Sequence, residues 1–347
     1  MNTTTVKTAL MMLVLCSGFL HFTFASQRLR SFRIFENREI WSNSSTTCKR
    51  INASLVTLYD EEDARFTANF TKQAKDAKEW LYVWLGLHNR SFSQSNGGSA
   101  SLKQRCGAIH NNNLECFDCR TNISLSSSIQ SINDALAPLN KTWCQALKYC
   151  SQNHTDFNSS GAVDTSFWIA LDTWEWQDNG CSSFRKWVET GDNTGECTRV
   201  DINDTVGIHK YGCDSTAKPF CASGTVRIKV IQNPLTWVEA YDYCKQNHSR
   251  LLWIRDEYDQ WAVEQWLNYT AEEGDFWIGL RQSRVFGFWI WTSDTTVGFS
   301  KWKDPETPQQ SMFDHCGAFN NKDWDWKDLD CSKELPFLCE ENIEYIK

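Results

Sequence analysis

Short apolar runs recur along the chain, and each run begins with a tryptophan and ends with a leucine. They occupy Trp84 to Leu87, Trp168 to Leu171 and Trp277 to Leu280. A continuous apolar run of this length, rich in aromatic and branched residues, is typical of a strand that is buried on both faces. The pattern therefore predicts three buried core strands.

A helical pattern of apolar residues precedes two of these runs. The tryptophan, alanine, tyrosine and cysteine of 237–244 fall on one helical face. Thr236 with Glu239, and Thr142 with Gln145, have the spacing of a capping box, in which each residue satisfies a free backbone N–H of the other. We therefore expect helices that begin after Thr142 and after Thr236.

The helical segments belong to a repeat. Segments 142–154 and 236–248 share Trp, Ala, Tyr, Cys, Gln, Asn and His at one fixed offset, and Trp41 to Cys48 repeats the Trp-to-Cys spacing a third time. Ile40 stands at the cap position of this third segment, so a weaker helix start is expected there. Internal repetition of this kind predicts tandem modules.

Cysteines close each copy of the repeat, and the combination resembles the C-type lectin-like domain. The resemblance covers nearly all of the chain that follows the N-terminal apolar segment. It implies an α+β fold of tandem disulfide-stapled modules, each with a small antiparallel sheet, helices and an irregular loop region that bears the binding site. The disulfides that it implies are Cys106–Cys119, Cys150–Cys221, Cys197–Cys213, Cys244–Cys339 and Cys316–Cys331.

The resemblance divides the chain that follows an expected signal peptide at 1–25 into modules at 28–121, 132–222 and 225–341. The first module is degenerate, because it has no room for the family's long loop and Ser127 stands where a closing cysteine is expected. Four cysteines remain unassigned by the family pattern, and three pairings of them stay open, one being Cys48–Cys116 with Cys144–Cys181. The four are Cys48, Cys116, Cys144 and Cys181.

The N-terminus has the features of a secretory signal peptide. Lys7 precedes an apolar run from Ala9 to Leu20, and Ala25 offers a small residue for cleavage. The run is shorter than the ~20 residues that a membrane-spanning helix needs, so we expect a secreted, extracellular protein with no membrane span in the mature chain. Loss of Cys16 with this segment leaves an even number of cysteines, as expected of a disulfide-bonded protein.

Sequons of the Asn-x-Ser/Thr type are dense along the chain and predict a glycoprotein. The candidate glycosylation sites are Asn43, Asn52, Asn69, Asn89, Asn122, Asn140, Asn153, Asn158, Asn203, Asn247 and Asn268.

The formal net charge of −8 comes without a basic stripe, which argues against nucleic acid as a partner. Neither a nucleophile elbow, nor a phosphate-binding glycine loop, nor a zinc-protease motif occurs in the sequence. We therefore expect a binding protein rather than an enzyme, with no catalytic residues and no cofactor apart from calcium as an open question.

Sugar-binding members of the family hold calcium through carboxylate and amide oxygens, in a long-loop triplet and in a Trp-Asn-Asp triplet. In the last module the candidate ligands are Glu306, Asp314 and Asp328, but Lys327 replaces the asparagine of the second triplet. In the middle module the corresponding residues, 208–210, read Ile-His-Lys and offer no carboxylate or amide. The sequence therefore predicts that calcium binding is weak or lost.

These observations predict a secreted recognition protein that binds an extracellular glycan or protein ligand without calcium. One alternative is a calcium-dependent carbohydrate-binding lectin that acts through the last module. A second alternative is a structural extracellular scaffold with no ligand.

Overall fold

The computed structural model describes ten stretches of the chain. They are residues 28–73, 82–89, 105–110, 113–118, 167–169, 174–188, 195–201, 207–283, 285–303 and 314–346. The expected signal peptide, the capping box of Thr142 and the apolar residue Leu171 lie outside them. None of the helices in these stretches is long and apolar enough to cross a membrane.

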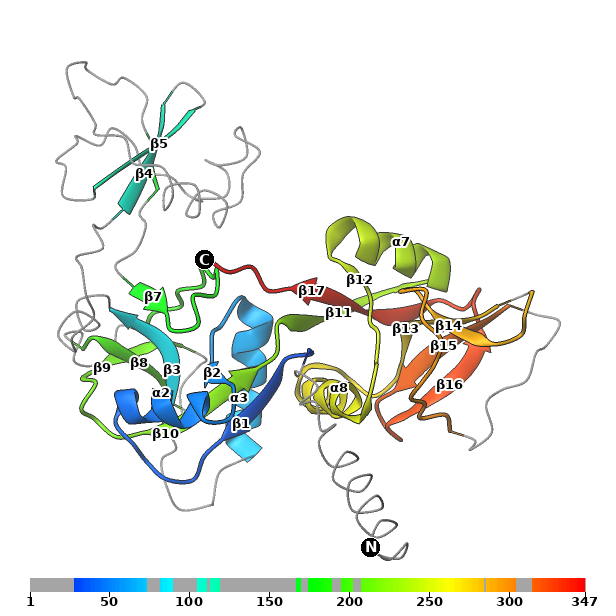
Figure 1. The fold of residues 1–347 in the computed structure, drawn as a ribbon, viewed down its shortest axis with the longest axis horizontal. Helices are drawn as coiled ribbons and strands as arrows, with labels where there is room; N and C mark the ends of the chain where they lie inside the picture. Colours follow the sequence, from blue (N-terminus) through cyan, green and yellow to red (C-terminus); the bar gives the residue numbers. More distant parts are fainter. Residues whose placement is uncertain are drawn as a thin grey trace, which may run out of the picture.

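The described chain is α+β and forms two larger sheets, each with a pair of helices, and one small sheet (Figure 1). We call the unit built on residues 28–89 and 174–224 the N-terminal module, and the unit built on residues 225–346 the C-terminal module. The central strand of each sheet pairs in parallel with the strand that closes its module. The two modules therefore repeat one architecture.

The N-terminal module has the strand order β1-β10-β3-β8-β9, with β2 on β10 and β7 on β3. Its strands are β1 (Ser31–Ile34), β2 (Ser54–Leu55), β3 (Tyr82–Asn89), β7 (Trp174–Trp176), β8 (Cys197–Asp201), β9 (His209–Tyr211) and β10 (Lys218–Ser223), and its helices are α2 (Trp41–Lys49) and α3 (Glu61–Gln73).

The C-terminal module has the strand order β11-β17-β13-β15-β16, with β12 on β17 and β14 on β13. Its strands are β11 (Val226–Leu235), β12 (Arg250–Leu251), β13 (Asp275–Gln282), β14 (Trp289–Trp291), β15 (His315–Asn320), β16 (Asp325–Asp330) and β17 (Leu335–Asn342), and its helices are α7 (Trp237–Asn247) and α8 (Glu257–Thr270).

The tryptophans of the repeat occupy matching places in the two modules. Trp41 of α2 donates its indole N–H to the carbonyl of Leu85 at 2.9 Å, and Trp237 of α7 donates to the carbonyl of Ile278 at 2.8 Å. Each helix is thereby tied to the buried central strand of its own sheet. The repeated Trp-to-Cys spacing thus marks the helix that packs on this strand.

The N-terminal module corrects part of the sequence-based division. One sheet contains β1 and β3 from the expected first module, and β8 and β10 from the expected second, so the expected boundary between 121 and 132 does not separate two sheets. The expected disulfide Cys150–Cys221 is wrong, because Cys221 is bonded to Cys48, with 5.4 Å between their Cα atoms. Helix α2 therefore carries the cysteine that we expected at position 150 to bond with Cys221.

The chain between β3 and β7 is consequently an insertion within the N-terminal module. Its described part is a separate sheet with the order β5-β4-β6, formed by β4 (Arg105–His110), β5 (Asn113–Asp118) and β6 (Phe167–Ile169). Trp168, which we expected in the core strand of a middle module, pairs instead with Ala108 of β4. The Trp-x-Trp segment at 174–176 forms β7, which is hydrogen-bonded to β3.

The two modules share one continuous core. Phe66 of α3 stacks on Trp266 of α8 with 4.6 Å between the ring centroids, and Phe32 of β1 packs against both rings. The junction between the modules turns at Gly224, whose φ is +89° and whose Cβ, were there one, would meet the Leu29 carbonyl oxygen. The junction is therefore tight enough to require glycine.

Arginines add charged contacts across the same interface. Arg28 bonds to Asp259 of the C-terminal module, Arg30 bonds to Asp63 of its own module, and Arg227 reaches back from β11 to Asp63. Asp63 and Asp259, the third residues of α3 and α8, are 2% and 1% exposed. A buried carboxylate is stable only when a cation or hydrogen-bond donor is beside it. The two contacts that cross the interface, Arg28–Asp259 and Arg227–Asp63, therefore help to fix how the two modules are oriented.

The C-terminal segment crosses from its own sheet to the N-terminal module (Figure 1). Ile343 donates its backbone N–H to Thr225 at 2.9 Å, and Ile346 donates to Asn179 at 3.0 Å. The carbonyl of Glu344 accepts from the N–H of Cys181 at 2.8 Å. We call residues 343–346 the C-terminal strap.

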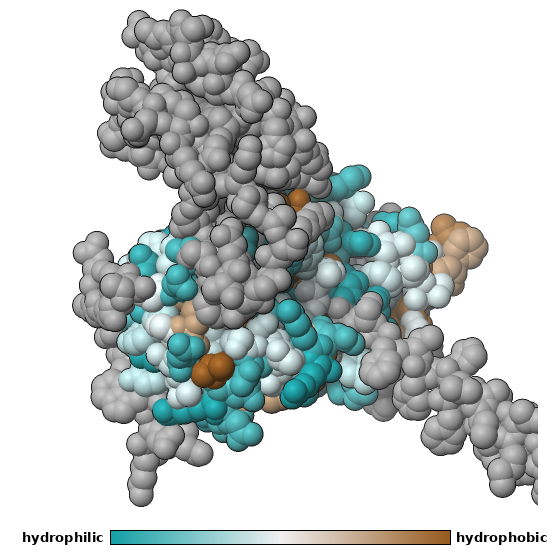
Figure 2. All heavy atoms as spheres, turned by 60° about the vertical axis from the view of Figure 1, so that its left-hand side comes forward, coloured by the Kyte–Doolittle hydropathy of each residue, from teal (hydrophilic) through white to brown (hydrophobic). Residues whose placement is uncertain are grey.

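Apolar colour on the surface is confined to small areas in the view of Figure 2, where hydrophilic residues predominate among those that are coloured. The most exposed large apolar residues of the described chain are Val285 and Phe286, in the loop between β13 and β14. Phe286 stacks on Phe288 with 5.5 Å between the ring centroids.

Candidate ligand-binding surface

The carboxylate of Asp328 lies on β16 and is held by a histidine. His315 of β15 contacts Asp328 through its Nδ1, at 2.5 Å from Oδ1. Burial raises the pKa of Asp328, and the contact with His315 acts in the opposite direction. The imidazole thus uses a carboxylate oxygen that a calcium ion would need.

Lys327 points away from this carboxylate. Neighbouring residues in a strand project to opposite faces, and the Nζ of Lys327 donates to Oδ1 of Asp275 at 2.8 Å. Asn320 donates to the same oxygen at 2.7 Å. We expected the ammonium at the ligand position beside Asp328, whereas the structure places it at the start of β13.

Of the other expected calcium ligands, Glu306 lies outside the described residues. Asp314 precedes β15, and its backbone carbonyl accepts from the N–H of Cys331 at 3.2 Å. Within the described stretches, no group of three or more His, Cys, Asp or Glu side chains is arranged to hold a metal ion. Of the three expected ligands, the structure therefore shows Asp328 in contact with His315. Whether Glu306, Asp314 and Asp328 can hold calcium together stays untested.

The matching strand of the N-terminal module presents cations instead of carboxylates. Lys210 of β9 has its Nζ 4.7 Å from the ring centroid of Trp187 and 5.6 Å from that of Trp174. His209 is buried, and Arg199 of β8 stacks on Tyr211 with its guanidinium carbon 3.1 Å from the ring centroid. Cations packed on aromatic rings, which attract each other, therefore occupy both faces of this strand pair, with Lys210 on one face and Arg199 with Tyr211 on the other.

The structure contains three of the disulfides that the resemblance implied, namely Cys197–Cys213, Cys244–Cys339 and Cys316–Cys331. Cys106 lies in β4, whereas Cys119 and Cys150 are outside the described residues. The pairing of Cys48 with Cys116 is excluded, because Cys48 is bonded to Cys221, and Cys181 is also disulfide-bonded.

Sequon asparagines that the structure describes lie at the surface. The exposed ones are Asn43, Asn52, Asn69, Asn247 and Asn268, and Asn89 is half-buried. The remaining sequon asparagines, Asn122, Asn140, Asn153, Asn158 and Asn203, are outside the described residues.

Two features of this surface were not found from the sequence. His315 was missed because its relation to Asp328 depends on strand pairing, in which Gly317 lies opposite Asp328. The aromatic contacts of Lys210 were missed because the tryptophans were assigned to the core. The only sequence signal for either feature is the position of His315 directly before Cys316.

Comparison with known proteins gives one family match. The family model described as the lectin C-type domain matches residues 233–341. This range begins in the last residues of β11 and ends within β17, so it covers most of the C-terminal module.

The similar curated proteins are receptors and lectins. The secretory phospholipase A2 receptor of Mus musculus is 27% identical over 39% of this chain and 9% of its own length, and that of Oryctolagus cuniculus is 24% identical over 57% of this chain and 12% of its own. The hepatic lectin of Gallus gallus is 28% identical over 31% of this chain and 51% of its own. The match thus spans a small part of the two receptors.

Solved structures similar to the chain include human lithostathine, at 20% identity and a TM-score of 0.31 over 34% of this chain and 92% of that one. A calcium-independent type II antifreeze protein is 24% identical, with a TM-score of 0.31 over 35% of this chain and 89% of that one. From the family match, residues 233–341 of this chain form a C-type lectin domain, and the chain is similar to receptors and lectins that carry such domains.

Proposed function

We propose that this chain is a secreted recognition protein, not an enzyme, that binds an extracellular glycan or protein ligand without a calcium ion. The observation that carries the proposal is the contact between His315 and Asp328 at 2.5 Å. Calcium requires several oxygen ligands with free lone pairs, and a carboxylate that is held by an imidazole meets this need poorly.

The N-terminal module supports the same proposal. The buried His209 stands at the position of the family's asparagine ligand, and Lys210 stands at that of the aspartate ligand. A divalent cation next to Lys210 would be repelled, because no carboxylate of β9 offsets the ammonium. Recognition by this module would therefore rest on hydrogen bonds and aromatic contacts.

A glycan array probed with the purified full chain, once with calcium and once with a chelator, tests the proposal. Spots that keep their signal in the chelator support it. Spots that lose their signal in the chelator and regain it with calcium would instead favour the calcium-dependent lectin, for which Glu306, Asp314 and Asp328 are the candidate ligands.

A chain that binds no glycan is then probed for a protein ligand on cell surfaces, again with chelator present. The absence of binding in both assays would favour the structural scaffold and reject the proposal.

A further inference from the structure

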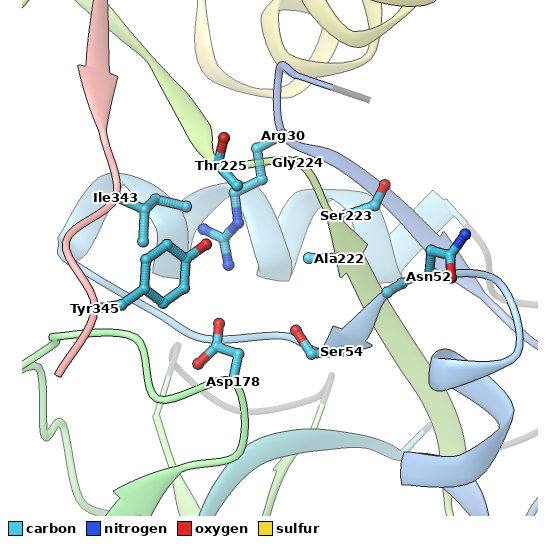
Figure 3. Close-up of a pocket in the computed structure, with 11 residues that line it drawn as sticks. Arg30, Asn52, Ser54, Asp178, Ala222, Ser223, Gly224, Thr225, Ile343 and Tyr345 are labelled. Carbon is cyan, nitrogen blue, oxygen red and sulfur yellow. The ribbon is translucent and has the colours of Figure 1, made fainter. Parts of the chain in front are cut away.

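A cavity of about 180 Å³ lies where the C-terminal strap crosses the N-terminal module (Figure 3). Its walls come from the turn after α2, the end of β10 with the following junction, the turn after β7, and the strap. It is thus formed by both modules together, and it lies on residues other than those of β15 and β16 discussed above.

Opposite charges face this cavity from two sides. The guanidinium of Arg30, which directly precedes β1, points into it, and the carboxylate of Asp178 points into it from the turn after β7 (Figure 3). Arg30 is 5% exposed and donates to Asp63 at 3.1 Å and to the carbonyl of Thr57. Arg30 and Asp178 form no ion pair with each other within 4.0 Å, and both line the cavity.

Asp178 is fixed in this position by its own hydrogen bonds. Its Oδ1 accepts from the hydroxyl of Thr57 at 2.9 Å and from the N–H of Gly180 at 2.8 Å. Its Oδ2 accepts no hydrogen bond from the residues that the structure describes. A rigid carboxylate with one oxygen directed at a cavity is a preorganised acceptor.

An aromatic ring and hydroxyl groups complete the walls. Tyr345 of the strap forms one side, and Ser54 and Ser223 lie across from it (Figure 3). Burial, and secondarily the charge of Asp178, raises the pKa of Tyr345, so its phenol stays protonated and able to donate at neutral pH.

We infer that this cavity binds one pyranose ring of a saccharide. The volume lies below the ~300 Å³ that is usual for larger ligands, which restricts the occupant to a single small unit. Neighbouring sugar hydroxyls donate to a carboxylate and accept from a guanidinium, and the C–H face of the ring packs on an aromatic side chain. The inference rests on the proposed recognition of glycans and places a site for it outside the family's calcium region.

The pyranose has two possible sources, because Asn52 lines the same cavity and belongs to the sequon at 52–54. Asn52 is exposed and has a φ of +54°, in the turn that follows α2. The occupant is therefore either a free saccharide or the first sugar of a glycan attached to Asn52.

Saturation-transfer NMR on the full chain, in chelator, tests the inference with glucose, galactose, mannose and N-acetylglucosamine as probes. At least one probe should bind to wild type or to Asn52→Gln. Tyr345→Ala, which removes the aromatic wall, and Thr225→Trp, which fills the rim, should each weaken that binding at least tenfold. Tyr258→Ala, at a tyrosine of α8 that is 62% exposed, should leave it unchanged.

The outcomes distinguish a free saccharide from a glycan on Asn52, and they distinguish failure of the cavity site from failure of the proposed function. Equal binding by wild type and Asn52→Gln identifies a free saccharide, and binding by Asn52→Gln alone identifies the chain's own glycan. The inference is overturned if neither protein binds a probe, or if binding survives both cavity substitutions. Chelator-resistant array signals that survive these substitutions would overturn the cavity site alone, whereas chelator-sensitive signals would overturn the proposed function alone.

Discussion

At Asp328, an imidazole and a metal ion would compete for one carboxylate. His315 contacts that carboxylate at 2.5 Å, while Lys327 is paired with Asp275. Histidine, rather than lysine, is therefore the nearer obstacle to calcium. The distinction could not be drawn from the order of residues in the triplet, because it depends on the faces of a strand.

We accordingly expect that wild type binds no calcium tightly at neutral pH. We also expect two substitutions to raise its calcium affinity by different amounts. His315→Asn should raise calcium affinity more than Lys327→Asn, because it frees the carboxylate and adds an amide oxygen. At an effective dielectric near 20, a unit charge repels a divalent ion at ~4 Å by roughly 8 kcal/mol. Lys327→Asn removes such a charge, but it should raise the affinity less because the ammonium is turned toward Asp275.

Calorimetric titration with calcium measures both effects, and Lys333→Asn, at an exposed lysine of the same module, is the control. A micromolar dissociation constant for wild type would contradict the prediction and favour the calcium-dependent alternative.

Among the elements, the corresponding helices α7 and α2 differ at their first residues, because α7 begins with a side-chain cap and α2 begins without one. The hydroxyl of Thr236 accepts from the N–H of Glu239 at 3.4 Å, and the carboxylate of Glu239 accepts from the N–H of Thr236 at 3.0 Å. Ile40, at the same position before α2, provides no side-chain cap. The expected capping box at Thr236 is confirmed, and α2 lacks a side-chain cap, as Ile40 led us to expect, whereas the box expected at Thr142 lies outside the described residues.

Substitutions at these two caps should have opposite effects. Thr236→Ala leaves a backbone N–H of α7 without its partner and should lower the free energy of unfolding by about 1 kcal/mol. Ile40→Thr supplies a cap to α2 and should stabilise the protein by no more than that amount. Urea unfolding followed by circular dichroism measures both, and a Thr236→Ala midpoint equal to that of wild type would contradict the role of the cap.

The elements of the C-terminal module could be predicted because their signals are contiguous. The cap at Thr236, the run at 277–280 and the closing cysteines follow one another without interruption. In the N-terminal module the insertion separates β3 from β7, and the segment at 142–154 resembles α7 more closely than α2 does. Sequence similarity therefore favoured the wrong partner for Cys221.

For the molecule as a whole, the interface between modules combines an aromatic core with paired charges. Asp60 bonds to Arg227 and Lys229, both on β11 of the other module. Burial acts to raise the pKa of Asp60, but these two cations outweigh burial and hold its pKa well below the ordinary value. The charged form of Asp60 is therefore favoured by folding.

This shift predicts a pH-dependent stability. Because the pKa of Asp60 is lower in the folded than in the unfolded chain, its contribution is fully present above the unfolded value of ~3.9 and is lost as pH falls toward the folded value. Asp60→Asn should thus be less stable than wild type at pH 7, and the difference should shrink below about pH 4.

Urea unfolding at pH 7, 5 and 3 measures this difference. Glu36→Gln is the control, since Glu36 is 84% exposed in its pair with Lys218, and such surface pairs contribute about 0–1 kcal/mol. A difference between wild type and Asp60→Asn that is constant across these pH values would refute the linkage.

The bond between Cys48 and Cys221 closes a covalent ring across 173 positions, and the whole insertion between β3 and β7 lies inside it. A protease that cuts once within the insertion therefore opens the ring without releasing a fragment. The nicked chain would migrate at full mass on a gel until a reducing agent is added, and would then separate into two pieces. The insertion can accordingly be cleaved while its scaffold remains one molecule.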